Sequence, residues 1–239
     1  MMISICVPMY NESSIIAETA KTLHTYMKNN FGDDFEIVFS DDGSRDGSAE
    51  IVNDLAFPNV RVVGYEDNQG KGCAVRNAIL SSVGDVVIFT DADLAYGVEI
   101  ISDACERIKE GECDVVIASR AKHERGYEGY TPIRKIVSKT YIKFLNFLLG
   151  IKVSDAQCGF KAFDGDNGRR IFSFCSANNF AFDLEVILIA QKMKLRIFEM
   201  PAMIINHRES KVNVLRDAPR MVKEALNIKK RVKSVELEP

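Results

Sequence analysis

The stretch Asp85-Val-Val-Ile-Phe-Thr-Asp-Ala-Asp93 largely decides how this chain is expected to fold. Four apolar residues and a threonine lead directly into two carboxylates that stand two positions apart. A short, continuously apolar run is typical of a strand that is buried on both faces of a parallel sheet. Polar groups just beyond the carboxyl end of such a strand lie where α/β sheets bind ligands. The stretch therefore predicts a buried strand that ends in a functional turn.

Strand-like and helix-like segments alternate on both sides of this stretch. The expected strands cover residues 3–7, 35–39, 60–63, 85–90 and 114–118, and the expected helices cover residues 13–30, 48–55, 70–82 and 98–110. This alternation predicts an α/β fold in which helices flank a mainly parallel central sheet. Beyond residue 120 we expect a charged loop, then helices over 132–149, 182–192 and 214–233, with strand character near 155–163 and 197–205.

The composition is that of an ordinary globular protein. The chain has 239 residues, of which 46% are hydrophobic and 27% charged, and its net charge is -3, so disorder and a disulfide-rich miniprotein are excluded. Six cysteines without a CxxC pair predict free thiols and a cytoplasmic location. The sequence also predicts no signal peptide and no transmembrane span, and its slight acidity gives no reason to expect nucleic acid.

Asp91 and Asp93 carry the first chemical signal. Residues i and i+2 of an extended segment point the same way, so the two carboxylates are expected on one side. Hard oxygen ligands suit Mg²⁺ or Mn²⁺, with the remaining positions filled by waters and by the oxygens of a diphosphate. Taken alone, the pair fits a solvent-exposed acidic turn equally well.

A second acidic cluster, Asp41-Asp-Gly-Ser-Arg-Asp-Gly-Ser48, follows another expected strand. Its carboxylates are suited to accept hydrogen bonds from ribose hydroxyls or a base N–H. A capped turn is the alternative, because Asp46 or Ser48 would serve as a helix N-cap. No glycine-rich phosphate loop follows the first strand, and Gly70-Lys-Gly72 does not match G-x-G-x-x-G, which disfavours a Rossmann dehydrogenase.

In their order and spacing, four motifs of the first half resemble the inverting family 2 glycosyltransferases of GT-A fold. These motifs are Val7-Pro-Met-Tyr-Asn-Glu12, the cluster 41–48, Asn68-Gln-Gly-Lys-Gly72 and Thr90-Asp-Ala-Asp93. The second half resembles the polyprenyl-phosphate hexosyltransferase branch through Asp155-Ala-Gln-Cys-Gly-Phe-Lys161, Phe182-Asp-Leu-Glu185 and Glu209-Ser-Lys211. These forms are more similar to dolichyl-phosphate β-glucosyltransferases than to the mannosyl enzymes. The flanking transmembrane helices of many relatives and the Gln-x-x-Arg-Trp signature of processive synthases are not found.

The resemblance implies a role for each matching residue. The nucleotide-sugar would be bound by Pro8, Tyr10, Glu12, Asp41, Asp42, Lys71, Asp91, Ser210 and Lys211. The acceptor phosphate would be held by Arg120 and Arg134, since guanidinium forks match phosphate oxygens. The divalent ion, Mg²⁺ or Mn²⁺, would be bound by Asp91, Asp93 and His207, although a lone histidine is more often structural.

The mechanism that we expect is an in-line displacement of the nucleoside diphosphate, which inverts the anomeric centre. Besides Asp93, the candidate catalytic residues are Asp155 and Asp183, each chosen by position as a general base. A phosphate acceptor is already an anion and needs no such base, whereas a sugar hydroxyl needs one. Asp183 is equally suited to capping the helix that Glu185 continues.

Three functions remain open at this point. The first is a metal-dependent transfer of hexose, from UDP-glucose, to a polyprenyl phosphate in cell-envelope glycan biosynthesis. The second is a soluble family 2 transferase that acts on a hydroxyl of a glycan or lipid-linked oligosaccharide, and the third is a nucleotide-sugar-binding module without transfer activity. The oligomeric state is not predicted.

The domain organisation that we expect is a GT-A catalytic domain over residues 1–213 and a basic amphipathic helix over residues 214–239. Within the domain, residues 1–120 form the nucleotide-sugar half and residues 121–213 the acceptor half. The basic, apolar segment 133–149 and the C-terminal helix present cationic faces that suit anionic lipid. They predict peripheral contact with the inner face of the cell membrane, and the alternative for 133–149 is a core-packed helix with exposed lysines.

Overall fold

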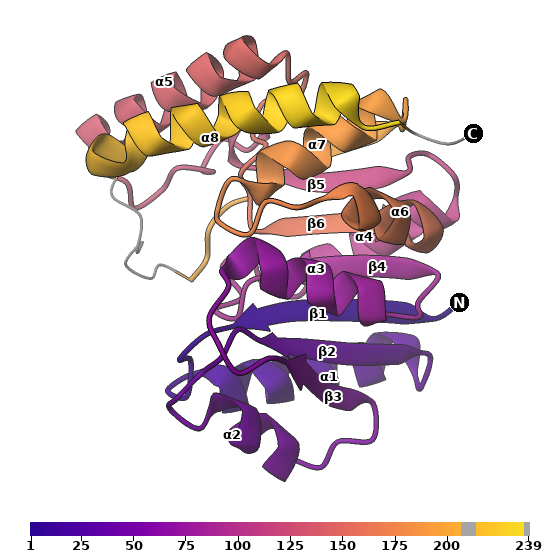
Figure 1. Cartoon of the computed structure of the whole chain (residues 1–239). Helices are drawn as coiled ribbons and strands as arrows, with labels where there is room; N and C mark the ends of the chain where they lie inside the picture. The colour runs from indigo at the N-terminus through magenta and orange to yellow at the C-terminus, as the bar shows by residue number, and fades with distance from the viewer. Residues whose placement is uncertain (207–213, 237–239) are drawn as a thin grey trace.

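A computed structural model describes residues 1–206 and 214–236 of the chain; the side chains of residues 134 and 214–221 are outside this description. One seven-stranded sheet forms the centre, in the order β3-β2-β1-β4-β6-β5-β7 (Figure 1). The strands are β1 Ile3–Met9, β2 Phe35–Asp41, β3 Val60–Gly64, β4 Val86–Thr90, β5 Val115–Ser119, β6 Phe160–Asp164 and β7 Ile197–Pro201. All the pairings are parallel except those of β6, which runs antiparallel to both β4 and β5. The expected α/β class with a mainly parallel sheet is therefore confirmed.

Eight α-helices are assigned within the described residues. They are α1 Ile16–Phe31, α2 Ser48–Asp54, α3 Lys71–Ser81, α4 Ile100–Lys109, α5 Pro132–Leu149, α6 Gly165–Phe174, α7 Phe182–Lys192 and α8 Val214–Ser234, with a short 3-10 turn at Arg120–Lys122. Helix α6 is the one that the sequence reading did not predict. None of these helices is both long and apolar enough to span a membrane, as far as the described residues extend.

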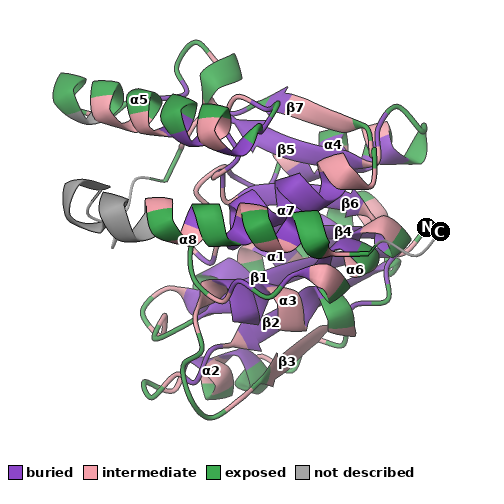
Figure 2. Cartoon of the chain, turned by 45° about the horizontal axis from the view of Figure 1, so that its top comes forward, coloured by how far each residue is buried: buried purple, intermediate pink, exposed green. Residues whose placement is uncertain are grey.

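Two hydrophobic cores lie on opposite faces of the sheet, and strand β4 shows why. Its residues alternate between the faces, so that Val87 and Phe89 join the core beneath α3, α6 and α7, while Val86 and Ile88 join the core beneath α1 and α4. Every residue of β4 is buried, as its continuously apolar sequence predicts (Figure 2). The six cysteines are free and buried, which confirms the expectation of free thiols.

Strand β1 lies between β2 and β4, so the chain leaves it toward one side of the sheet and later returns to the other side. In a doubly wound sheet the crevice at such a switch point, outside the carboxyl ends of the strands, is the usual ligand site. The topology therefore directs attention to the turns that follow β1, β2 and β4.

Candidate active site

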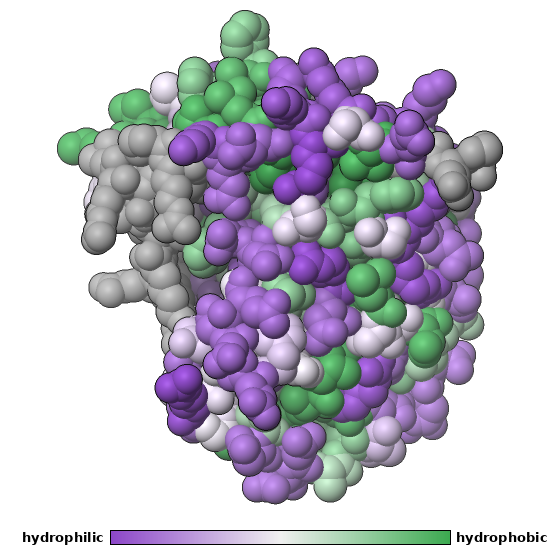
Figure 3. All heavy atoms as spheres, in the orientation of Figure 1, coloured by the Kyte–Doolittle hydropathy of each residue, from purple (hydrophilic) through white to green (hydrophobic). Residues whose placement is uncertain are grey.

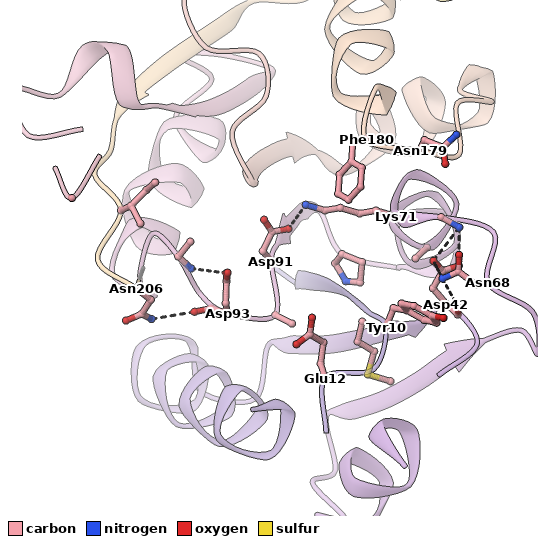
Figure 4. A pocket seen from close by; sticks show the side chains of 18 of the residues that line it. Tyr10, Glu12, Asp42, Asn68, Lys71, Asp91, Asp93, Asn179, Phe180 and Asn206 are labelled. Atoms are coloured by element: carbon pink, nitrogen blue, oxygen red, sulfur yellow. Dashed lines mark hydrogen bonds and ion pairs between the residues drawn. The ribbon is translucent and has the colours of Figure 1, made fainter. Parts of the chain in front are cut away.

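A cavity of about 690 Å³ opens at this edge of the sheet. Its volume lies within the range typical of small-molecule sites. The predicted residues that line it are Pro8, Tyr10, Glu12, Asp42, Lys71, Asp91 and Asp93. They lie at or just after the carboxyl ends of β1, β2 and β4 and at the start of α3, and most of their side chains are labelled in Figure 4. The fold thus brings four motifs that are far apart in the sequence into one pocket.

The turn after β1 is fixed by the acidic loop after β2. The backbone N–H groups of Asn11, Glu12 and Ser13 donate to the side chains of Ser44, Ser48 and Asp46, at 2.9 Å in each case. Tyr10, which precedes this turn, lines the cavity and is 41% exposed. An exposed aromatic ring in a polar pocket is suited to stacking against a nucleotide base.

Asp42 is the anchor of the loop that precedes α3. Its buried carboxylate accepts hydrogen bonds from the Tyr65 hydroxyl, the Asn68 side chain and the backbone N–H groups of Gln69 and Gly70, at 2.7–3.1 Å. Asp41 supports the preceding turn instead, by accepting from the N–H of Ser44. Because both oxygens of Asp42 are already engaged by the protein, its contact with a ribose or base stays a prediction.

Two ion pairs lie close to the start of α3, one in the pocket wall and one buried. The Lys71 ammonium forms an ion pair with Asp91, and the buried Lys161 ammonium contacts Asp183 and the carbonyl oxygen of Cys158. Burial alone would lower the pKa of Lys71, but Asp91 and Asp183 outweigh it and raise that pKa above its usual value. Burial raises the pKa of Asp183, and Lys161 and Lys71 oppose it only in part. Lys71 is therefore a fully charged ammonium group inside the pocket.

The carboxylate of Asp91 fits into a space that only glycine leaves. A Cβ atom on Gly159 would lie 2.1 Å from Oδ2 of Asp91, far inside ordinary contact distance. Gly159, the glycine of the Gln-Cys-Gly-Phe-Lys motif, therefore leaves the space that the carboxylate of Asp91 occupies.

Asp93 lines the same cavity from the turn after β4. Its Oδ1 accepts from the N–H of Ala95, and its carbonyl oxygen accepts from the side chain of Asn206. Asn206 also lines the pocket. The segment after β7 is therefore attached to the Asp91–Asp93 turn as far as the description extends, which is one residue short of His207.

Arg120 is held by a buried carboxylate. Its guanidinium donates from Nε and Nη2 to the two oxygens of Asp155, at 2.7 and 2.9 Å, and from Nη1 to the hydroxyl of Tyr130. Burial would lower the pKa of Arg120, but Asp155 raises it well above its usual value. Asp155 is fully buried, whereas Tyr130 lines the cavity. Arg120 thus reaches the pocket wall through Tyr130, and neither it nor Asp155 is among the residues that line the cavity.

The remaining predicted residues are not tested by this geometry. Arg134 belongs to the first turn of α5, but its side chain is not described. His207, Ser210 and Lys211 lie outside the described residues. Their proposed roles stay predictions.

Asn179 and Phe180 are among the pocket residues that the sequence reading missed, as are Tyr130 and Asn206. Asn179 and Phe180 precede α7 and face the Lys71 side of the pocket in Figure 4, and the ring of Phe180 is 46% exposed. The signal that would have found these two residues is their position directly before the Phe-Asp-Leu-Glu motif.

The oxygen ligands of the pocket suit a hard divalent cation whose remaining coordination positions are filled by the substrate. The described residues contain no group of three or more His, Cys, Asp or Glu side chains that is placed to hold a metal. Two carboxylates, Asp91 and Asp93, nevertheless share the pocket, and Gly159 leaves room for the first of them. Mg²⁺ and Mn²⁺ sites of this kind use one or two carboxylates together with waters and substrate phosphates. The residues therefore fit such an ion bound jointly with a diphosphate.

The sheet order and the pocket at its switch point define a GT-A fold, and solved structures support this class. Glucosyl-3-phosphoglycerate synthase of Mycobacterium tuberculosis, solved in complex with Mn²⁺, UDP and glucosyl-3-phosphoglycerate, is 19% identical with a TM-score of 0.69, over 98% of this chain and 81% of that one. Mannosyl-3-phosphoglycerate synthase of Rubrobacter xylanophilus is 20% identical with a TM-score of 0.66, over 97% of this chain and 73% of that one. At these identities the likeness concerns the fold.

The chain belongs to glycosyl transferase family 2, whose family model matches residues 4–167. A dolichyl-phosphate beta-glucosyltransferase of Trichomonas vaginalis is 33% identical over 82% of this chain, and the match spans 61% of the relative's length. The glycosyltransferase AglD of Haloferax volcanii is 29% identical over 90% of this chain and 35% of its own length. A dolichyl-phosphate beta-glucosyltransferase of Dictyostelium discoideum is 29% identical over 95% of this chain and 73% of its own length. The expected family is confirmed.

Proposed function

We propose that this protein is a metal-dependent, inverting hexosyltransferase that moves glucose from UDP-glucose to a polyprenyl phosphate. The observation that carries the proposal is the single pocket in which Asp91, Asp93 and Lys71 meet the turn that bears Tyr10. This combination suits a diphosphate with a base attached. The dolichyl-phosphate beta-glucosyltransferases among the relatives support glucose as the sugar and a polyprenyl phosphate as the acceptor.

In this proposal, the residues of the pocket divide the work according to their charge. Tyr10 stacks on the base, while Asp42 keeps the neighbouring loop in shape. Asp91 and Asp93 would hold the divalent cation, which neutralises charge on the diphosphate when it is bound. Lys71, which the pocket keeps charged, stabilises the negative charge that grows on the leaving diphosphate as the bond to the anomeric carbon breaks. Ser210 and Lys211 would add donors on the same side.

The acceptor is an anion in this proposal, so no side chain has to remove a proton. Both candidate bases are already paired, Asp155 with Arg120 and Asp183 with Lys161. Neither carboxylate is among the residues that line the cavity, so neither is placed to take a proton from a sugar hydroxyl there, which supports a phosphate acceptor over a hydroxyl acceptor. We propose that Arg120 orders the acceptor side through Tyr130 and that Arg134 binds the acceptor phosphate. We likewise propose that residues 1–120 serve the donor and residues 121–213 the acceptor.

A transfer assay tests this function directly. Purified protein is incubated with Mn²⁺, a polyprenyl phosphate and radiolabelled UDP-glucose, with GDP-mannose in parallel. We expect glucose label in an organic-extractable, acid-labile product, no mannose label, and loss of transfer when EDTA removes the metal. Label that appears only in water-soluble glycan would refute the lipid acceptor, and UDP-glucose binding without any product would favour a binding module.

Helix α5 supports a further part of the proposal, namely peripheral contact with a membrane. It contains four cations and no acid: Arg134, Lys135, Lys139 and Lys143. The side chains exposed along it include Ile133, Ile136, Phe144 and Phe147, whose spacing places them on one stripe. The opposite side packs into the core through Ile142, Leu145 and Leu149. Figure 3 shows hydrophobic side chains gathered over α5 at the top of the molecule. An apolar stripe beside lysines is suited to an anionic lipid surface.

Vesicle sedimentation tests this contact. We expect the protein to sediment with phosphatidylglycerol vesicles at low salt, and less at 0.5 M salt because the attraction is screened. Phe147, which is 87% exposed, is expected to insert its ring, so Phe147→Ser should weaken binding about tenfold. Val83→Ser removes another exposed apolar residue, 67% exposed and outside α5, and serves as the control. Binding that ignores both salt and the Phe147 substitution would refute the membrane contact and leave the transferase proposal intact.

A further inference from the structure

The buried carboxylate of Glu185 connects the C-terminal helix to a loop on the far side of α7. Its Oε2 accepts hydrogen bonds from the N–H groups of Ser176 and Ala177, at 3.0 and 2.7 Å. Its Oε1 accepts from Nε of Arg231 in α8, at 3.0 Å, and also contacts Nη2. Glu185 is fully buried, so its charge depends on these four donors.

The loop that Glu185 holds is packed against the beginning of α3. The carbonyl oxygen of Asn178 accepts from the N–H of Gly72 at 2.7 Å, and its side chain accepts from Arg76 at 2.9 Å. The approach is so close that a Cβ on Gly72 would lie 2.4 Å from the carbonyl oxygen of Ala177. A shift of this loop would therefore shift the first turn of α3.

The start of α3 and the 176–178 loop, which these contacts join, both continue into residues of the pocket. Lys71 precedes Gly72 and forms the ion pair with Asp91, while Asn179 and Phe180 follow directly on Asn178 and line the same cavity (Figure 4). Hydrogen bonds and short stretches of backbone thus lead from α8, through Glu185 and the 176–178 loop, to Lys71 in the pocket.

We propose that Arg231 is a positioning residue for the donor site. Through Glu185 it fixes the 176–178 loop, which in turn sets the place of Lys71 on one side of the pocket and of Phe180 on the other. Among the described residues, the side-chain hydrogen bonds of Arg231 go to Glu185, which does not line the cavity, so the proposed action on the donor is indirect. The proposal rests on the proposed function in naming the ligand as a sugar nucleotide, but its structural part does not.

A second attachment of α8 makes the proposal separable from simple stability. The ammonium group of Lys192, at the end of α7, donates to the carbonyl oxygens of Val232, Lys233 and Val235 at 2.7–2.9 Å. Lys192 thus caps the same helix end without touching the 176–178 loop. Lys192→Met removes an α8 anchor, whereas Arg231→Ala removes an α8 anchor together with the link to the pocket.

Hydrogen exchange of the intact protein, without any ligand, tests the link first. We expect Arg231→Ala to accelerate exchange of the Ser176, Ala177 and Gly72 amides about tenfold, whereas Lys192→Met accelerates exchange only in α8. Arg231→Lys, which keeps the charge on a shorter side chain, is expected to restore part of the protection and remains informative if the alanine variant fails to fold. Equal effects of the Arg231 and Lys192 variants on the loop, or no effect of either Arg231 variant, would overturn the proposal.

Kinetics then test the consequence for the donor. Arg231→Ala is expected to raise the KM for UDP-glucose about three- to tenfold, with a smaller change in the KM for the acceptor, and Lys192→Met to leave both near the wild-type values. If Arg231→Ala and Lys192→Met lower kcat equally and leave KM unchanged, Arg231 has only a structural role and the proposal is wrong. If the wild-type protein shows no transfer, the proposed function fails while the exchange data still decide whether the link exists.

Discussion

Replacement of Asp93 by alanine is expected to lower glucose transfer by about 10³-fold while leaving the fold intact. Its carboxylate lines the pocket and belongs to the pair that would hold the divalent cation, so its loss removes charge stabilisation of the leaving diphosphate. The side chain lies in a turn outside the sheet, and the bond that it accepts from Ala95 is a local one. The measurement is kcat/KM with saturating Mn²⁺, together with the thermal midpoint of unfolding.

Asp103→Ala is the matched control, because it removes an exposed acid from α4 away from the pocket. We expect this variant to keep wild-type activity. Activity within threefold of wild type in Asp93→Ala would contradict the assignment of the metal pair, whatever the result for the control.

Gly159→Ala is expected to lower transfer about 10²-fold although it removes no charged group. The added Cβ would lie 2.1 Å from Oδ2 of Asp91, so the carboxylate has to move by about 1.3 Å to reach an ordinary contact distance of 3.4 Å. Misplacement of a catalytic group by this amount costs about two orders of magnitude in rate. We expect the Kd for Mn²⁺ with UDP to rise in parallel, as measured by calorimetry.

Gly111→Ala separates a displaced carboxylate from a general loss of stability. Gly111 has a φ of +70° with open space around it, so alanine there strains the backbone far from the pocket. This variant should lose about 1–2 kcal/mol of stability and keep its activity. Normal activity and metal binding in Gly159→Ala would show that Asp91 does not need its observed position.

The sequence pattern predicted the strands of the first half and the helices between them, because each apolar run is followed by a polar turn and a segment of helical spacing. Helix α6 was missed for a physical reason. Gly165 and Gly168 lower its helix propensity, and they are present because close packing demands them: a Cβ on Gly168 would lie 2.9 Å from the side chain of Phe163. The antiparallel direction of β6 was equally unpredictable, since it depends on pairing between strands far apart in the sequence.

The candidate site was predictable where a motif ends a strand. Tyr10, Asp42 and Asp91 follow β1, β2 and β4, and parallel strands bring such residues to one edge. The ion pairs were not predictable, because the partners are separated by many residues, as Arg120 and Asp155 are. These pairs alter the chemistry that the motifs suggest. The candidate bases Asp155 and Asp183 are each paired with a cation, and Lys71 is a charged group of the pocket.

The structure tests one of the two interpretations of the segment 133–149, namely core packing, and contact with a membrane stays a prediction. One side of α5 packs into the core, as the alternative predicted, and the other side exposes apolar residues beside lysines. Helical periodicity alone did not separate a core-packed helix from a helix that faces lipid, because apolar residues at helical spacing fit both.

The central claim is that a divalent cation and a donor diphosphate meet at Asp91 and Asp93, and anomalous diffraction from crystals grown with MnCl₂ and UDP tests it most directly. The account predicts one manganese peak within coordination distance of a carboxylate oxygen of this pair and of the UDP phosphates, with the uracil ring against Tyr10. A manganese peak remote from both aspartates, or UDP bound outside this pocket, would contradict it.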